Sequence, residues 1–264
     1  MVLMLCEDRL GVRSYTHIIE PGTVVPREAL PGLEADVERL AKAEPIQYVL
    51  GKAEFYGRSF DVNPSVLIPR PETEQLVKEV VSFALNLDRP ARVLDLCTGS
   101  GCIAWSVLQE VPGSEVVALD ISEEALETAR GQFPHDGPAP FFVRADVLDF
   151  EKGLGLDGSF DVIVSNPPYI MESQKSGMRP NVLEYEPGLA LFVPDGDPLL
   201  FYRAVEHWAS LLLADDGAGF VEINEDLGVQ TADVFTSSGW KEVLQIQDFY
   251  NKTRFVRFSK KAAE

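Results

Sequence analysis

The stretch RVLDLCTGSGCIAWSVL, from Arg92 to Leu108, constrains the fold more than any other part of this 264-residue chain. An apolar strand pattern at 92–96 leads into the loop Thr98-Gly99-Ser100-Gly101, and apolar residues at helical spacing follow the loop. A strand, a glycine turn and a helix N-terminus form a cradle for a cofactor that contains adenosine, because glycines let a ligand approach the backbone closely.

Strand and helix patterns alternate on both sides of this loop, beginning with a helix that Pro71 opens. Strand patterns lie at 92–96, 115–121, 141–146, 160–165 and 219–223, with helical patterns from Ser122 and over 201–212. Two further strands, at 241–249 and 253–258, are predicted to pair as a hairpin. The alternation predicts an α/β fold, with a mostly parallel sheet, helices on both faces and ligands at the carboxyl ends of the strands.

The chain ahead of Pro71 has a different pattern. Met1 to Glu44 predicts short helices that are broken at Pro21-Gly22, Pro26 and Pro31-Gly32, the clearest helix placing Leu33, Val37 and Leu40 on one face. Strand-like runs around Gly57, between Tyr48 and Leu67, predict a hairpin. We therefore divide the chain into a helical domain at 1–45, a β-hairpin linker at 46–69 and an α/β domain at 70–264.

The glycine loop alone does not choose the cofactor, since Gly99-x-Gly101-x-x-Ala104 followed by an acid also fits a nicotinamide dinucleotide site. Asp120 ends the next strand, where its carboxylate can accept hydrogen bonds from ribose hydroxyls. Asp95 lies just before the loop, and an anion there disfavours bound phosphates. The same anion suits the sulfonium and ammonium groups of S-adenosylmethionine, and together with the Asn-Pro-Pro-Tyr corner at 166–169 it favours methyl transfer over hydride transfer.

A stiff corner follows the apolar strand at 160–165. Its residues are Asn166, Pro167, Pro168 and Tyr169, and the two prolines lack N–H donors and hold φ near −65°. The Asn166 side-chain oxygen and the Pro167 carbonyl can together accept both hydrogens of a planar NH2 group, whose flat face Tyr169 would cover. Asn and Pro are also ordinary turn residues, but the position downstream of the glycine loop favours a functional role.

With these motifs the sequence closely resembles the PrmC/HemK family, the N5-glutamine methyltransferases that act on peptide-chain release factors. The matching segments are GKAEFYGRSFDVNPSVLIPRPETEQLV (51–77), LDLCTGSGCIA (94–104), the strand end at Asp120, SNPPYI (165–170), YEPGLALF (185–192) and DFYNKTRFV (248–256). Asn-Pro-Pro-Tyr occurs in several amino-methyltransferase families, whereas the run Arg70-Pro71-Glu72-Thr73-Glu74 is more specific to this one.

The resemblance implies the class I S-adenosylmethionine-dependent methyltransferase fold, Rossmann-like, with a seven-stranded sheet in which one of the last strands runs antiparallel. It implies S-adenosylmethionine as cofactor and S-adenosylhomocysteine as product. The implied cofactor-binding residues are Asp95, Cys97, Thr98, Gly99, Ser100, Gly101, Asp120, Asp146, Val147 and Asn166, with Asp95 near the methionine amino end, Asp120 at the ribose and Asp146 near the adenine. The implied catalytic and acceptor-binding residues are Asn166, Pro167, Pro168 and Tyr169.

Two further segments are second-rank candidates for the acceptor pocket. Arg70, Glu72 and Glu74 belong to the first, although a helix that Pro71 starts, with acids in its first turn, explains them as well. The second is Glu184-Tyr185-Glu186-Pro187, after the Asn166 corner. The chain departs from the family at its start, because only 1–44 stand before the shared region where members usually carry a complete N-terminal helical domain. This departure bears on recognition of the class 1 release factors that the resemblance implies as partners.

Composition limits the partners and the compartment. A net charge of −19 opposes tight binding to naked DNA or RNA and suits a basic protein segment better, although an acidic surface can also serve solubility alone. No apolar run has the length of a membrane-spanning helix, and we expect a cytoplasmic protein. The three cysteines, Cys6, Cys97 and Cys102, lack metal or disulfide spacing, so no metal is expected.

Three alternatives remain open from the residues. An N6-adenine methyltransferase could hold its target amine with the same corner, but no basic stripe is visible. A non-catalytic cofactor-binding partner of the translation machinery is a second alternative, against which the intact corner at 166–169 counts. An oxidoreductase that uses the glycine loop for NAD is the third.

Overall fold

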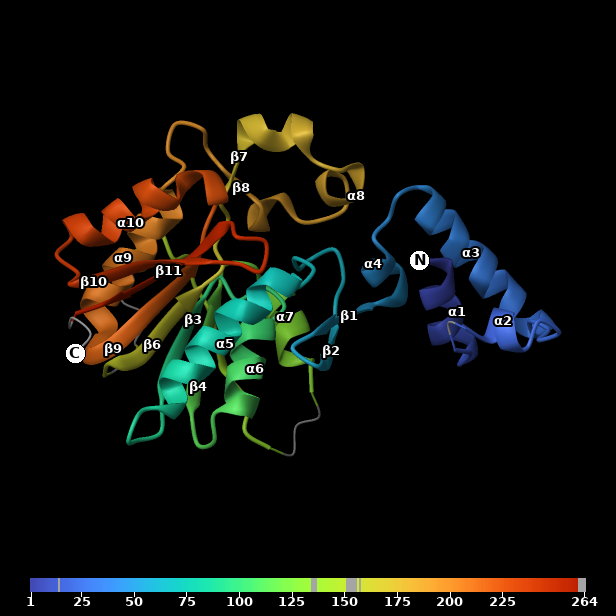
Figure 1. The fold of residues 1–264 in the computed structure, drawn as a ribbon, viewed down its shortest axis with the longest axis horizontal. Helices are drawn as coiled ribbons and strands as arrows, with labels where there is room; N and C mark the ends of the chain where they lie inside the picture. Colours follow the sequence, from blue (N-terminus) through green and yellow to red (C-terminus); the bar gives the residue numbers. More distant parts are fainter. Residues whose placement is uncertain (14, 134–136, 151–155, 157, 261–264) are drawn as a thin grey trace.

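The computed structural model describes residues 1–13, 15–133, 137–150, 156 and 158–260 (Figure 1). Seven strands form one sheet, in the order β10-β11-β9-β6-β3-β4-β5. Their bounds are β3 (Arg92–Leu96), β4 (Glu115–Asp120), β5 (Phe141–Arg144), β6 (Phe160–Ser165), β9 (Leu213–Glu222), β10 (Glu242–Gln247) and β11 (Thr253–Ser259). Strand β11 pairs antiparallel with both of its neighbours, and the other pairs are parallel, which confirms the expected sheet.

Helices cover both faces of this sheet (Figure 1). α5 (Pro71–Leu85) and α6 (Cys102–Glu110) pack on one face, and α9 (Leu200–Leu212) and α10 (Gly228–Ser237) pack on the other. Successive side chains of a strand point to opposite faces, so Val162 and Val164 of β6 join the core under α5 and α6, while Ile163 joins the core under α9. A sheet buried on both sides explains why its strands read as continuous apolar runs.

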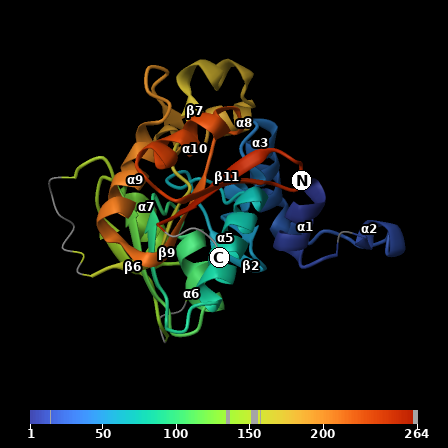
Figure 2. The ribbon, with the colours of Figure 1, turned by 60° about the vertical axis from the view of Figure 1, so that its left-hand side comes forward.

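The first 50 residues form a separate small helical unit, which lies to one side of the sheet in both ribbon views (Figures 1 and 2). Its elements are α1 (Val2–Leu10), α2 (Thr16–Ile19), η1 (Arg27–Ala29), α3 (Leu30–Ala41) and α4 (Ile46–Leu50). Leu5, Ile46 and Val49 make its buried core. The predicted hairpin is confirmed, with β1 (Lys52–Phe55) and β2 (Arg58–Asp61) paired around Tyr56 and Gly57.

Two local predictions for this unit are wrong. Pro31 and Gly32 do not break a helix but lie in the first turn of α3, where a proline is tolerated because its missing N–H has no helical partner there. Val37 is 45% exposed rather than packed with Leu33 and Leu40. The buried side chain of α3 is instead Asp36, whose carboxylate accepts a hydrogen bond from Arg9 Nε at 2.8 Å.

The carboxyl ends of the central strands are covered by the chain between β6 and α9, drawn in yellow at the top of Figure 1. This segment contains β7 (Ile170–Met171), η2 (Glu172–Gly177), α8 (Pro180–Leu183), η3 (Gly188–Ala190) and β8 (Phe192–Val193). The remaining elements are α7 (Glu123–Arg130), beside β4 and β5, and η4 (Glu225–Leu227). No described helix combines the length and the apolar character needed to cross a membrane.

Candidate active site

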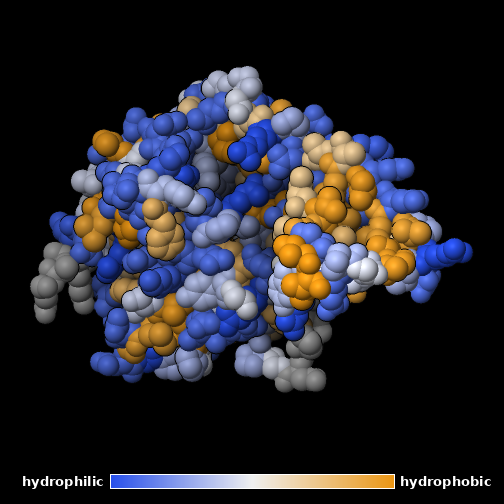
Figure 3. Space-filling model, turned by 45° about the vertical axis from the view of Figure 1, so that its right-hand side comes forward, coloured by the Kyte–Doolittle hydropathy of each residue, from blue (hydrophilic) through white to orange (hydrophobic). Residues whose placement is uncertain are grey.

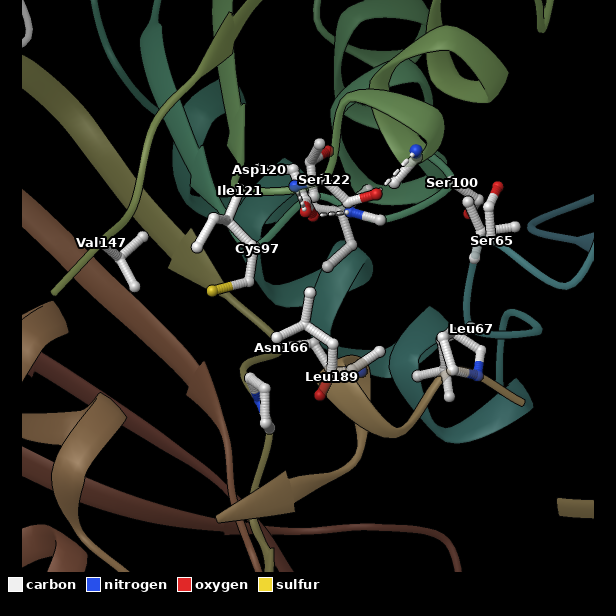
Figure 4. A pocket seen from close by; sticks show the side chains of 18 of the residues that line it. Ser65, Leu67, Cys97, Ser100, Asp120, Ile121, Ser122, Val147, Asn166 and Leu189 are labelled. Carbon is white, nitrogen blue, oxygen red and sulfur yellow. Dashed lines mark hydrogen bonds between the residues drawn. The ribbon is translucent and has the colours of Figure 1, made fainter. Parts of the chain in front are cut away.

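A cavity of about 530 Å³ lies at the carboxyl ends of β3, β4, β5 and β6. Its volume falls in the range of small-molecule sites. Figure 4 shows Cys97, Asp120, Val147 and Asn166 arranged around this space, together with Leu189 of the segment between β6 and α9 and Leu67 of the segment before α5. The predicted residues that line it are Arg70, Cys97, Thr98, Gly99, Ser100, Asp120, Asp146, Val147, Asn166 and Pro168.

The loop at 97–101 contains three residues with positive φ, a backbone conformation that residues other than glycine rarely adopt. Cys97, Gly99 and Gly101 have φ values of 62°, 55° and 77°. A Cβ on Gly101 would also lie 3.0 Å from the Cβ of Ala129, so α6 and α7 can approach only because this position is glycine. Gly101 is itself the N-cap of α6, and it does not line the cavity.

Two of the three strand-end acids face the cavity. Asp120 accepts the backbone N–H of Gly99 on Oδ2 at 2.8 Å and that of Ser122 on Oδ1 at 3.0 Å. Asp146 accepts the N–H of Leu148 on Oδ1 at 2.9 Å. Each acid therefore makes the local turn contact that its position favours, and each carboxylate keeps lone pairs for a ligand.

Asp95 lies behind the loop and is fully buried. Thr98 Oγ1 donates to its Oδ2 at 2.6 Å, whereas its Oδ1 makes no hydrogen bond of good geometry among the described residues, although the backbone N–H of Ala104 also favours the charged form. Burial raises the pKa of Asp95 to about 7. Asp95 does not line the cavity, but its carboxylate bonds to Thr98, which does.

Cys97 and Val147 supply apolar wall to the cavity, Val147 being buried and packed with the core under α9. Burial raises the pKa of the Cys97 thiol well above its ordinary value, so the thiol is protonated. Cys102 also lies in the core, which agrees with the packing role predicted for both cysteines.

The Asn166 corner begins directly after β6. Asn166 and Pro168 line the cavity, and Pro167 is buried. Tyr169 does not line the cavity, since its ring packs against the core under α9 and its hydroxyl donates to Glu222 Oε1 at 3.1 Å. Asn166 Nδ2 donates to Thr73 Oγ1 at 3.3 Å, which turns the amide oxygen to the opposite side.

The two second-rank segments contact each other. Arg70 donates to Glu186 Oε1 at 2.6 Å, and Glu186 Oε2 accepts the backbone N–H of Ile68 at 3.1 Å. Glu186 thus fastens the segment after the Asn166 corner to the start of α5. Tyr185 adds a hydrogen bond from its hydroxyl to the carbonyl of Lys42 at 2.7 Å, which ties the same segment to the helical unit.

Of the remaining candidate residues in the two second-rank segments, only Pro187 lines the cavity. Glu74 accepts the N–H of Tyr56 at 3.0 Å and so holds the hairpin turn against α5. Glu72 is half-buried, Glu184 is exposed, and neither lines the cavity. Pro187 does line it, together with Leu189 and Ala190.

Sequence reasoning missed Thr73 and Glu222 as site residues. Thr73 lines the cavity, and its hydroxyl donates to Glu222 Oε2 at 2.7 Å. Glu222 ends β9 beside β6, where Ser165 pairs with Val221. An acid inside the apolar run Gly219 to Ile223 was the available signal for it.

Comparison with known proteins agrees with this geometry. Residues 76–183 match the methyltransferase small domain family. A methyltransferase structure from Pyrococcus furiosus has a TM-score of 0.54 at 17% identity and covers 86% of this chain and 97% of its own, which supports the fold. The fold is that of the class I S-adenosylmethionine-dependent methyltransferases.

Two relatives are similar over almost the full length. The release factor glutamine methyltransferase of Bacteroides thetaiotaomicron is 42% identical over 96% of this chain and 90% of its own. That of Flavobacterium psychrophilum is 38% identical over 91% of this chain and 84% of its own. This chain therefore belongs to the release factor glutamine methyltransferase family.

Proposed function

We propose that this protein transfers a methyl group from S-adenosylmethionine to the side-chain amide nitrogen (N5) of a glutamine in class 1 peptide-chain release factors, the GGQ-motif glutamine by resemblance. One observation carries the proposal: Asn166, at the start of the corner, lines the same cavity as the glycine loop and Asp120. A methyl donor on that loop and an acceptor amide at that corner would then meet within one space. Release factors act in translation, so the reaction belongs to the cytoplasm.

The cavity fits the donor in three places. The loop at 97–101 would lie under the methionine part, with the carboxylate of Asp95 near the ammonium. Asp120 would take the ribose hydroxyls. Asp146 and Val147 would lie near the adenine, one as a polar partner and the other as apolar wall.

The acceptor is a weak nucleophile, because the lone pair of an amide nitrogen is delocalised into its carbonyl. When bound, S-adenosylmethionine supplies an electrophilic methyl carbon on a positively charged sulfur. The glutamine nitrogen would attack that carbon in line, the C–S bond would break with its electron pair left on the sulfur of S-adenosylhomocysteine, and the nitrogen would release one proton to water. Hydrogen bonds to Asn166 Oδ1 and the Pro167 carbonyl would orient the nitrogen and increase its electron density. The proton becomes acidic only as the new bond forms, so no dedicated base is needed.

We assign recognition of the release factor to the helical domain at 1–45, joined by the linker at 46–69 to the catalytic domain at 70–264. Apolar side chains gather over the N-terminal helices in Figure 3. Among the exposed ones are Met1, Val2, Met4, Ile18, Ile19 and Val24. Exposed apolar patches of this kind are typical of protein-binding surfaces.

The test is peptide mass spectrometry of a release factor after incubation with the protein and S-adenosylmethionine. The proposal expects a gain of one methyl group on the glutamine of the GGQ motif. The variant Asn166→Ala is the control, and we expect it to leave donor binding largely intact while methyl transfer falls by about a hundredfold or more. An unmodified release factor under conditions where the donor binds would refute the function, and normal turnover by the variant would refute the role of Asn166.

A further inference from the structure

A chain of hydrogen bonds joins Asn166 to a buried carboxylate. Asn166 Nδ2 donates to Thr73 Oγ1 at 3.3 Å, and Thr73 Oγ1 donates to Glu222 Oε2 at 2.7 Å. Glu222 Oε1 accepts from the hydroxyl of Tyr169 at 3.1 Å. Thr73 is 2% exposed and Glu222 is 1% exposed, so water does not compete for these bonds.

Glu222 accepts both of its hydrogen bonds, one from the Thr73 hydroxyl on Oε2 and one from the Tyr169 hydroxyl on Oε1. The hydrogen of the Thr73 hydroxyl therefore points toward Glu222. The Thr73 oxygen is then an acceptor for its other neighbour, and only the NH2 end of the Asn166 amide can donate to it. The two ends of a carboxamide have nearly the same shape, so this polarity determines which end faces the cavity.

Several groups around Glu222 act on its charge. Burial raises its pKa, and the hydrogen bonds from Thr73 and Tyr169 and the positive charge of Arg254 act in the opposite direction. Glu72 adds a smaller repulsion. Burial is the largest of these effects, so the pKa of Glu222 stays above its ordinary value, although three groups favour the charged form.

A purely structural role does not explain the contact between Thr73 and Glu222. Thr73 is in the first turn of α5, where its backbone N–H already bonds to the carbonyl of Arg70 at 3.0 Å. Its hydroxyl reaches a residue 149 positions away rather than a helix end. A buried carboxylate also costs desolvation free energy that an apolar residue would avoid.

We propose that Thr73 and Glu222 are positioning residues for methyl transfer, which hold the Asn166 carboxamide with its oxygen toward the acceptor. In this orientation the Asn166 side-chain oxygen faces the cavity as a hydrogen-bond acceptor, and it selects a substrate that donates from an NH2 group. In the flipped orientation the amide NH2 would face the glutamine NH2, and two donors cannot bond to each other. The proposal rests on the proposed function and extends it to the residues that make the corner selective.

The test compares Thr73→Val with Thr73→Ser, which keeps the hydroxyl. Thr231→Val is the matched control, since Thr231 is fully buried in α10 and its hydroxyl has no partner among the described residues. We expect T73V to lower kcat for release-factor methylation by roughly tenfold to a hundredfold. T73S should lose no more than about threefold, T231V should match the wild type, and all three should bind the donor alike.

Two additional variants and an activity-independent measurement complete the design. E222Q can donate to the Thr73 oxygen and so reverse the chain, and we expect it to lose kcat as T73V does. Combining T73V with N166A should reduce kcat no further than N166A alone, because both act through one amide. The NMR signals of the Asn166 NH2 group, identified by their absence in N166A, should shift and exchange faster in T73V than in T231V.

The outcomes separate the two proposals. Wild-type protein that binds the donor but methylates no release factor would refute the proposed function, and the NMR comparison would still test the positioning role. If T73V retains wild-type kcat, or if its Asn166 NH2 signals match those of T231V, the positioning role is wrong.

Discussion

Asp120 has two contributions to the cofactor site that a single substitution removes together. Its carboxylate holds the glycine loop through Gly99 N–H and the start of α7 through Ser122 N–H, and it faces the cavity. We expect Asp120→Ala to weaken binding of S-adenosylmethionine by about 1–3 kcal/mol, the cost of unmade buried polar contacts. Isothermal calorimetry measures this directly, and unchanged affinity would remove Asp120 from the site.

Asp95 gives a prediction about pH and stability. Burial raises its pKa to about 7, with a smaller contribution from the charge of Asp120. The folded protein therefore binds a proton here that the unfolded chain releases near pH 4, so the free energy of unfolding should fall as pH rises from about 4 to 7. Asp95→Asn stays neutral, so relative to the wild type it should gain stability, on the order of 1 kcal/mol or more, between pH 5 and pH 8. Urea unfolding of the ligand-free proteins at both pH values tests this, and a difference that does not change with pH would contradict it.

Strand β9 lies between β6 and β11, and its parallel pairing with β6 brings Glu222 near Asn166. Gly219 of β9 pairs with Phe258 of β11, whose ring is fully buried and stacks on Phe235 with centroids 4.0 Å apart. A Cβ on Gly219 would lie 2.0 Å from the Cζ of Phe258. The glycine therefore provides the space in which that ring lies on the sheet.

We expect Gly219→Ala to lower the free energy of unfolding by about 1–3 kcal/mol, because the core would be overpacked. Gly196→Ala is the matched control, since a Cβ there meets nothing within 4 Å, and it should stay within about 0.5 kcal/mol of the wild type. Denaturant unfolding of both variants measures the two free energies of unfolding. Equal stability of the two would show that Phe258 can move away without cost.

The sequence predicted the sheet and its helices because apolar runs and helical spacing are local patterns. The strands β3, β4 and β6, the hairpin of β10 and β11 and the glycine loop were all visible in this way. Pro31 was misread because a proline has opposite meanings in the interior and in the first turn of a helix. Local patterns also placed Asp120 and Asn166 at strand ends, where the cavity lies.

The side-chain hydrogen bonds between these elements could not be predicted from the local sequence patterns. The hydroxyl of Thr73 bonds to Glu222 across 149 positions, and Arg70 bonds to Glu186 across 116. Such pairs depend on which strand lies beside which and on side-chain rotamers. Tyr169 illustrates the same limit, because its motif suggested a cover for the acceptor, whereas its hydroxyl is directed to Glu222.

For the molecule taken together, the exposed apolar patch on the N-terminal helices gives a prediction about the partner. Ile18 is 70% exposed, and we expect Ile18→Asp to raise KM for the release factor about tenfold, equivalent to about 1.4 kcal/mol of binding free energy. Val229, 63% exposed on α10, provides the matched control V229D, which should leave KM unchanged. Both variants should bind S-adenosylmethionine normally. Equal KM values for the two would mean that this patch does not contact the release factor.

The most direct test is a crystal structure of the protein with S-adenosylhomocysteine and a glutamine-containing release-factor peptide. The glutamine amide nitrogen should lie about 3 Å from both Asn166 Oδ1 and the Pro167 carbonyl oxygen, and it should point toward the sulfur of the product. A glutamine bound elsewhere, or an Asn166 amide whose NH2 group faces it, would contradict the proposed site.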